Sequence, residues 1–152
     1  GMLNRMHNIS KPEHPLSAFD ILDSFKLFLF DTGLLKYMAG IDNSAILLKS
    51  DYQFKGALTE NFVLQQLQSQ FETKPRYYST KNMEIDFIIQ NNTEIIPIEV
   101  KAGEEKSAPS FKKYIANNSP EHAIRFSKRG YKKDGAITNI PLYLATRLSE
   151  LI

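Results

Sequence analysis

The sequence predicts an α/β fold in which a mixed central β-sheet is flanked by helices. Three observations support this class. The segment from Tyr77 to Lys101 alternates apolar and polar residues with a period of two, which is typical of strands. The segment from Gly56 to Phe71 has no Pro and is rich in Leu, Gln and Glu, which favours a helix. Strand-like and helix-like segments then alternate to the end of the chain, as in layered α/β domains.

Length and composition narrow the possibilities further. The chain has 152 residues, of which 42% are hydrophobic, and no Cys. This is enough for one domain with its own core, and it excludes thiol catalysis, Fe–S clusters and zinc ribbons. His7, His14 and His122 are scattered, so we expect no His-based metal cage. Because we find neither an apolar run of about 20 residues nor a charged-then-apolar leader, we expect no membrane partner and a cytoplasmic location.

The N-terminal part is the least regular. Gly1 before Met2 is typical of a cloning scar and is left out of the argument. Residues 2–24 are mixed in character, and Pro12 and Pro15 interrupt them, so we predict a connector there. The apolar run from Phe25 to Phe30 is either a buried strand or the lead-in to a helix at 34–38, with Asp31 or Thr32 as its N-cap.

The remaining elements follow from periodicity. Leu64, Leu67 and Phe71 share one face of the helix at 56–71. Around the turn-like stretch Gln90-Asn91-Asn92-Thr93 the pattern predicts a β-hairpin. The expected elements after it are a helix (Ser107–Asn117), strands (His122–Ser127 and Ile137–Leu142) and a closing helix (Ala145–Ile152).

The net charge of +2 conceals an asymmetry. Between Lys101 and Lys133 there are nine Lys or Arg and three Asp or Glu, a local charge of +6. Such a segment indicates a polyanionic partner, although a solvated surface would give the same composition. Tyr77, Tyr78 and Tyr131 are candidates for stacking on bases or for packing.

The hairpin brings charged residues together. A turn centred near residues 91–93 places Asp86 across from residues 97–99. Asp86 and Glu99 then point away from two apolar sets, and Lys101 shares their face. The sets are Met83, Ile85 and Phe87 on the first strand and Ile96, Ile98 and Val100 on the second. Glu99 interrupts a nearly continuous apolar run, where a charge is costly unless it is paired or metal-bound.

A third acid comes from the predicted helix. Val63, Leu64 and Leu67 lie at positions +3, +4 and +7 from Glu60, so this carboxylate lies on the apolar face and breaks the pattern expected there. Carboxylates with a nearby Lys suit phosphodiester chemistry with a hard divalent ion. The alternatives are a cross-strand ion pair at the hairpin and, for Glu60, an acid that extends toward solvent.

At these residues the sequence resembles the PD-(D/E)xK nuclease superfamily, which has a restriction-endonuclease-like fold. Glu60 on a helix, Ile85-Asp86 and Glu99-Val100-Lys101 match its motif, with Ile where Pro is common. Four segments resemble more closely the C-terminal domain of bacterial and archaeal AAA-type ATPases, known as domain of unknown function 4143. They are Lys26–Leu35, Gly56–Val63, Glu84–Ile88 and Ile96–Lys101.

The resemblance implies a nuclease-like domain at 25–152 and a connector at 1–24 from a missing upstream ATPase region. Asp86, Glu99 and the Val100 carbonyl would hold Mg²⁺ or Mn²⁺. Lys101 would serve the attacking water, and Glu60 would complete the acidic cluster. The residues expected to contact DNA, the implied partner, are Lys112, Lys113, Lys128 and Arg129.

Three functions therefore stay open at this stage. The first is a metal-dependent nucleic-acid phosphodiesterase, for which a homo-oligomer is one of the assembly states left open. The second is a non-catalytic domain that binds DNA or protein for the ATPase. In the third, the charged residues are purely structural ion pairs.

Overall fold

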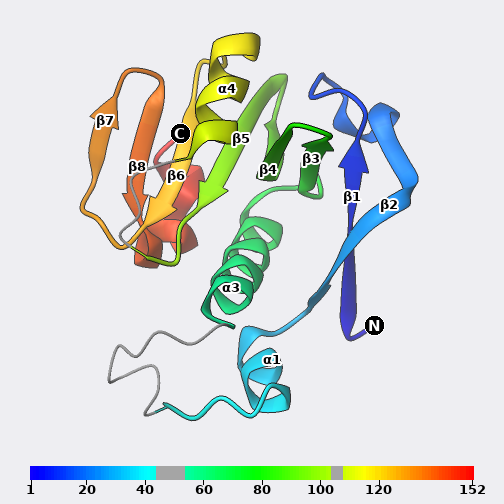
Figure 1. Cartoon of the computed structure of the whole chain (residues 1–152), viewed down its shortest axis with the longest axis vertical. Helices are drawn as coiled ribbons and strands as arrows, with labels where there is room; N and C mark the ends of the chain where they lie inside the picture. Colours follow the sequence, from blue (N-terminus) through cyan, green and yellow to red (C-terminus); the bar gives the residue numbers. More distant parts are fainter. Residues whose placement is uncertain (44–53, 104–107) are drawn as a thin grey trace.

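A computed structural model describes residues 1–43, 54–103 and 108–152 of the chain (Figure 1). In this described part, eight strands form one mixed sheet in the order β2-β1-β3-β4-β5-β6-β8-β7. The strands are β1 (Leu3–Ile9), β2 (Asp20–Leu29), β3 (Arg76–Thr80), β4 (Met83–Asn91), β5 (Glu94–Val100), β6 (Ala123–Ser127), β7 (Lys132–Asp134) and β8 (Ile137–Pro141). The prediction of an α/β fold with a mixed sheet is confirmed.

The centre of the sheet joins a hairpin to a parallel unit. β4 and β5 are antiparallel, whereas β5 runs parallel to β6 and β6 parallel to β8. The helix α4 (Pro109–Asn118) forms the crossover between β5 and β6. β5 lies in the interior of the sheet, and its residues Ile96 to Val100 are all buried, which explains its nearly continuous apolar sequence.

Helices cover both faces of the sheet. On one face, α3 (Lys55–Gln70) and the 3-10 segment η2 (Leu142–Glu150) pack on a core that includes Leu64, Phe87 and Ile98. On the other face, α4 and the short η1 (Leu16–Phe19) pack on a second core that includes Ile85, Ile88 and Phe111. In Figure 1, α4 lies in front of the sheet and η2 behind it.

The N-terminal segment differs from the expected connector. β1, η1 and the first half of β2 lie within residues 2–24, and β1 pairs with β2 along its length. Asn8 of β1 also replaces part of a backbone ladder, because its amide accepts from the Ser79 N–H (2.9 Å) and donates to the Ser79 carbonyl (3.3 Å). The segment is therefore an integral part of the sheet.

Most of the other local predictions are confirmed. The run from Phe25 is a strand, but not the predicted buried one, because Phe25 and Leu27 are exposed. The helix after it, α1 (Thr32–Met38), has Asp31 as its N-cap, accepting from the Leu34 N–H at 2.7 Å. The helix α3 and the β4–β5 hairpin lie where expected. Ser107, the first residue of the predicted helix before β6, and residues 104–106 of the basic segment lie outside the described residues.

Three details correct the sequence-based picture. The closing segment η2 is a 3-10 helix that begins at Leu142, before the expected position. The short edge strand β7 was not predicted. The third concerns β4, where the pairing with β3 shifts between the pairs Arg76–Ile88 and Tyr78–Ile85. This bulge places Ile85 in the core under α4 and Phe87 in the core under α3, so they do not share a face as predicted.

The described part of the chain contains no helix that is both long and apolar enough to cross a membrane.

Candidate active site

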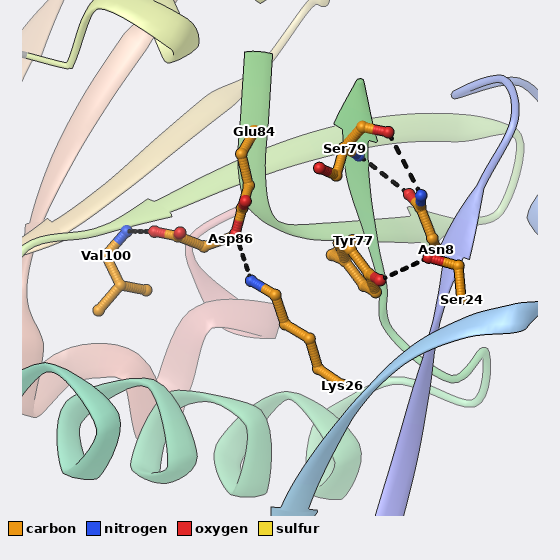
Figure 2. Close-up of polar contacts among 8 residues, drawn as sticks. All are labelled: Asn8, Ser24, Lys26, Tyr77, Ser79, Glu84, Asp86 and Val100. Carbon is orange, nitrogen blue, oxygen red and sulfur yellow. Dashed lines mark hydrogen bonds and ion pairs between the residues drawn. The ribbon is translucent and has the colours of Figure 1, made fainter. Parts of the chain in front are cut away.

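The predicted pair of acids lies where β4 and β5 separate. The ladder pairs Phe87 with Ile98 and Ile88 with Pro97, and continuing this register places Asp86 opposite Glu99. At that point the carboxylate of Asp86 replaces the ladder bond, because Oδ2 accepts from the Val100 N–H at 2.7 Å (Figure 2). The hydrogen bond fixes the orientation of the Asp86 carboxylate beside β5.

Glu99 and Lys101 form an ion pair on the strand that follows. The Nζ atom of Lys101 lies 2.7 Å from Oε1 of Glu99, and the Glu99 side chain is only 7% exposed. The Lys101 N–H donates to the Phe126 carbonyl at 2.8 Å, so the backbone of this residue is held against β6. The ammonium group therefore lies beside the acidic pair.

Two further charged groups join from outside the expected motif. Lys26 of β2 lies 2.5 Å from Oε1 of Glu84 (Figure 2), and it lines a cavity of about 470 Å³ together with Glu60. Sequence reasoning missed Lys26 as a site residue. Its one signal was a charge within the apolar run from Phe25 to Phe30, which is only interpretable once the distant partner Glu84 is known.

Asn61 anchors the helix that supplies Glu60. Its buried side chain accepts from the Leu29 N–H (2.9 Å) and donates to the Leu29 carbonyl (3.1 Å) and to Thr32 Oγ1 (3.0 Å). These bonds attach α3 to the end of β2 and the start of α1. Glu60, the preceding residue, is thereby positioned next to the strand that carries Lys26.

The acids of this cluster influence one another electrostatically. Burial and the charge of Asp86 raise the pKa of Glu60, although Lys26 and Lys101 oppose this. Burial also raises the pKa of Asp86, against the Val100 hydrogen bond and the two lysines. For Glu99, burial and the Asp86 charge raise the pKa to about 7, with Lys101 opposing. Glu60, Asp86, Glu99 and Lys101 thus lie within one electrostatic neighbourhood.

The composition of the cluster suits a hard divalent cation. When all are ionised, its four carboxylates (Glu60, Glu84, Asp86 and Glu99) and its two ammonium groups (Lys26 and Lys101) sum to −2. Burial is the largest cause of the raised pKa values of Glu60, Asp86 and Glu99, and repulsion from the other carboxylates, which reflects the net negative charge of the cluster, adds to it. A single divalent ion bound by carboxylate oxygens would compensate that net charge, and Mg²⁺ typically uses only one or two carboxylates together with water.

The three predicted acids are nevertheless not all close to one another. Among the described residues, three ligand atoms lie within 4.8 Å of one another at Glu94, Glu121 and His122, and not at Glu60, Asp86 and Glu99. Nδ1 of His122 already lies at hydrogen-bond distance, 2.8 Å, from Oε1 of Glu94, so metal titrations need a control for that second group.

The predicted nucleic-acid contacts divide into two groups. Lys112 and Arg129 line a cavity of about 590 Å³ between α4 and the β6–β8–β7 end of the sheet, whereas Lys113 and Lys128 do not line it. The same cavity contains Arg125 and Lys132, which sequence reasoning did not single out. Arg125 carried a signal, because it interrupts the apolar strand sequence Ala-Ile-Arg-Phe with a charge.

Comparisons with known proteins place the chain in a family without assigning an activity. No curated protein and no solved structure matches it. The family described as "Domain of unknown function (DUF4143)" matches residues 55–144, which include α3, the β4–β5 hairpin, α4 and β6 to β8. The match covers more than half of the chain, and the protein therefore belongs to the DUF4143 family.

Proposed function

We propose that this protein is a metal-dependent nucleic-acid phosphodiesterase with a PD-(D/E)xK-like site on a restriction-endonuclease-like fold. The observation that supports this most directly is the junction of β4 and β5. There, Asp86 is held by the Val100 N–H, and Glu99 lies in the opposite register position with Lys101 at 2.7 Å. A buried carboxylate, a half-buried carboxylate and an ammonium group in this arrangement favour phosphoryl chemistry over a simple surface ion pair.

Each residue has a distinct role in the proposed reaction. Asp86 and Glu99 would hold Mg²⁺ or Mn²⁺, and the Val100 carbonyl stays a predicted third ligand. The ion would polarise the phosphate and activate a water. Lys101 orients that water and donates to a non-bridging phosphate oxygen, which stabilises the charge that develops there. Glu60 holds an outer water of the cluster by accepting its hydrogen bond.

A cleavage assay tests this proposal. Supercoiled plasmid, linear duplex and single-stranded DNA are incubated with Mg²⁺ or Mn²⁺. We expect the substitutions Asp86→Asn, Glu99→Gln and Lys101→Met each to reduce the cleavage rate by about a hundredfold or more. The matched controls are Glu72→Gln and Lys74→Met, which alter an exposed Glu-x-Lys tripeptide elsewhere on the chain and should cleave normally. Equal rates in all five variants would refute the assignment.

Metal binding is measured separately by calorimetry in His122→Gln protein, so that the Glu94, Glu121 and His122 group does not contribute. Binding of Mg²⁺ or Mn²⁺ should disappear when Glu99→Gln is added to this background. If heat of binding persists unchanged in that double variant, the ion does not occupy the Asp86–Glu99 site.

The second candidate is a non-catalytic accessory domain that binds nucleic acid or protein for an AAA-type ATPase. Two observations favour this accessory role. The acids Glu60, Asp86 and Glu99 do not all lie within 4.8 Å of one another, and the basic cavity is separate from them. Under this alternative, DNA binds without a divalent ion and its affinity falls steeply with salt, while none of the plasmid forms is cleaved. DNA binding without cleavage would therefore select the accessory role, and the ATPase would be the partner to test next.

A further inference from the structure

A concave feature of the described residues is the cavity of about 590 Å³ on the α4 face of the sheet. We name it the basic pocket. Its cations come from three elements and one turn, and they are Lys112 of α4, Arg125 of β6, Arg129 after β6, and Lys132 of β7. Asp134 is its single acidic residue. A concave site with four cations and one carboxylate favours an anionic ligand.

A buried asparagine organises this pocket. Asn139 of β8 is 3% exposed, and its Oδ1 accepts from Ser127 Oγ at 2.7 Å and from Arg125 Nε at 3.2 Å. Its Nδ2 donates to the Gly130 carbonyl at 2.8 Å. The Asn139 amide therefore fixes both the guanidinium of Arg125 and the turn that carries Arg129. The pocket is preorganised by these hydrogen bonds.

The pocket lies in line with the candidate active site. Glu99 pairs with Arg125, Arg125 with Asn139, and Asn139 with Lys132 across four neighbouring strands. Residues paired in this way point to the same face of the sheet. The alternate residues of β5 and β6, such as Ile98 and Ile124, are in the core under α3, so the row that includes Glu99 and Arg125 faces α4. At roughly 4.8 Å per strand, it extends about 14 Å from Glu99.

We propose that the basic pocket binds the phosphates of a single strand of nucleic acid, which crosses β5, β6 and β8 along this row and reaches Glu99. The inference rests on the proposed function and adds a path and a substrate form. A row of about 14 Å is long enough to contact several consecutive phosphates of one strand. Tyr131, which is 60% exposed, also lines the pocket, and its ring can stack on an unpaired base.

The chain provides matched pairs of lysines for the test. Lys112 and Lys113 are adjacent and exposed on α4, and Lys132 and Lys133 are adjacent and exposed on β7, but only the first of each pair lines the pocket. The variant Lys112→Gln/Lys132→Gln is therefore compared with Lys113→Gln/Lys133→Gln. Both remove two positive charges from the same elements, so they differ in pocket position and not in net charge.

Binding of a fluorescein-labelled oligothymidylate is followed by fluorescence anisotropy in EDTA over a range of salt concentrations. We expect the pocket variant to bind about tenfold more weakly or worse, and its slope of log K against log salt to decrease by about 1.4, which is 0.7 for each lost phosphate contact. The control variant should keep both the affinity and the slope within error, which would remove Lys113 from the predicted nucleic-acid contacts, since it does not line the pocket. Tyr131→Ala should weaken binding, whereas Tyr143→Ala, an exposed tyrosine on η2, should not.

Three results would overturn the inference. They are equal losses in the two double variants, a preference for duplex over the single strand, and no binding at about 50 mM salt. The proposed catalytic function fails by a different result. Glu99→Gln retains the pocket and should bind the oligonucleotide at least as well as the wild type in EDTA. Normal oligonucleotide binding by the wild-type protein, with no cleavage when Mg²⁺ or Mn²⁺ is supplied, would refute catalysis and leave the pocket assignment intact.

Discussion

Asp86 completes the pairing of two strands with its side chain, because its carboxylate accepts the Val100 N–H at 2.7 Å just beyond the last ladder pair, Phe87–Ile98. The bond satisfies a backbone donor that lies among buried residues of β5. It also limits the freedom of the carboxylate, which is held beside β5 at Val100. The same interaction therefore stabilises the hairpin and orients a candidate metal ligand.

The first prediction separates these two effects. Asp86→Asn keeps an oxygen that accepts the Val100 N–H, whereas Asp86→Ala leaves this donor without its partner, which costs about 1–3 kcal/mol. We expect the alanine variant to have the lower free energy of unfolding by that amount in urea titrations at one pH. Since both variants remove the charge, equal stability would show that the hydrogen bond contributes nothing.

The second prediction concerns pH. The folded protein holds the Glu99 proton up to a pKa of about 7, compared with 4.5 as the ordinary value. Between these values the unfolded chain loses its proton first, so the free energy of unfolding falls as the pH rises and levels off above the folded pKa. The loss of stability over this pH range is on the order of 3 kcal/mol. Asp86 and Glu60, whose pKa values are also raised, act in the same direction.

Glu99→Gln provides the check on this prediction. The neutral amide resembles the protonated acid, so the variant should lose much of the decline in stability between about pH 4.5 and 7 and exceed the wild type above that range. Glu72→Gln, at an exposed position, should keep the wild-type profile. Urea denaturation across this range measures both, and an undiminished slope in Glu99→Gln would contradict the assignment to Glu99.

The third prediction tests the role of Lys26. Its ammonium lowers the pKa values of both Glu60 and Asp86, so Lys26→Met should raise both in the metal-free protein. Carboxyl ¹³C chemical shifts followed across a pH titration report each pKa directly. Lys81→Met, at the exposed turn between β3 and β4, is the matched control and should leave them unchanged. Unchanged pKa values in Lys26→Met would place this lysine outside the electrostatic cluster.

Local patterns were sufficient for the central hairpin and for α3. The alternation of apolar residues and the turn at 90–93 predicted both strands and their register, because all of this information lies within about 20 residues of sequence. The bulge in β4 has no such signature, and it became visible only through the partner strand β3. This is why the predicted common face of Ile85 and Phe87 was wrong.

The N-terminal strands depend on partners that are distant in sequence. Asn8 bonds to Ser79, Ser24 to Tyr77 at 3.0 Å, and Asp20 to Arg76. Neither an isolated strand nor a two-stranded ribbon is stable by itself, so the mixed composition of residues 2–24 did not indicate a strand. The candidate site also depends on partners that are distant in sequence. Lys26 can be recognised as a site residue only through its ion pair with Glu84, and Arg125 only through its register pairing with Glu99.

The last prediction measures how firmly the N-terminal strands belong to the domain. Asp20, the first residue of β2, forms a two-pronged ion pair with Arg76 of β3, with both nitrogen–oxygen distances at 2.9 Å. The side chains are only 17% and 10% exposed. Asp20→Ala leaves the guanidinium without this carboxylate, and removing one partner of a buried pair costs about 3–5 kcal/mol.

Urea titration of Asp20→Ala should show this loss as a single transition that all probes report together, because β1 lies between the two partners and shares their sheet. Glu150→Gln breaks the exposed pair of Arg147 and Glu150 and should leave the midpoint unchanged, since exposed pairs contribute little. Amide hydrogen exchange adds a local measurement. The contrary result is faster exchange at the amides of β1 and β2 alone, with the β4–β5 hairpin still fully protected. It would show that residues 3–29 unfold independently of the rest of the domain.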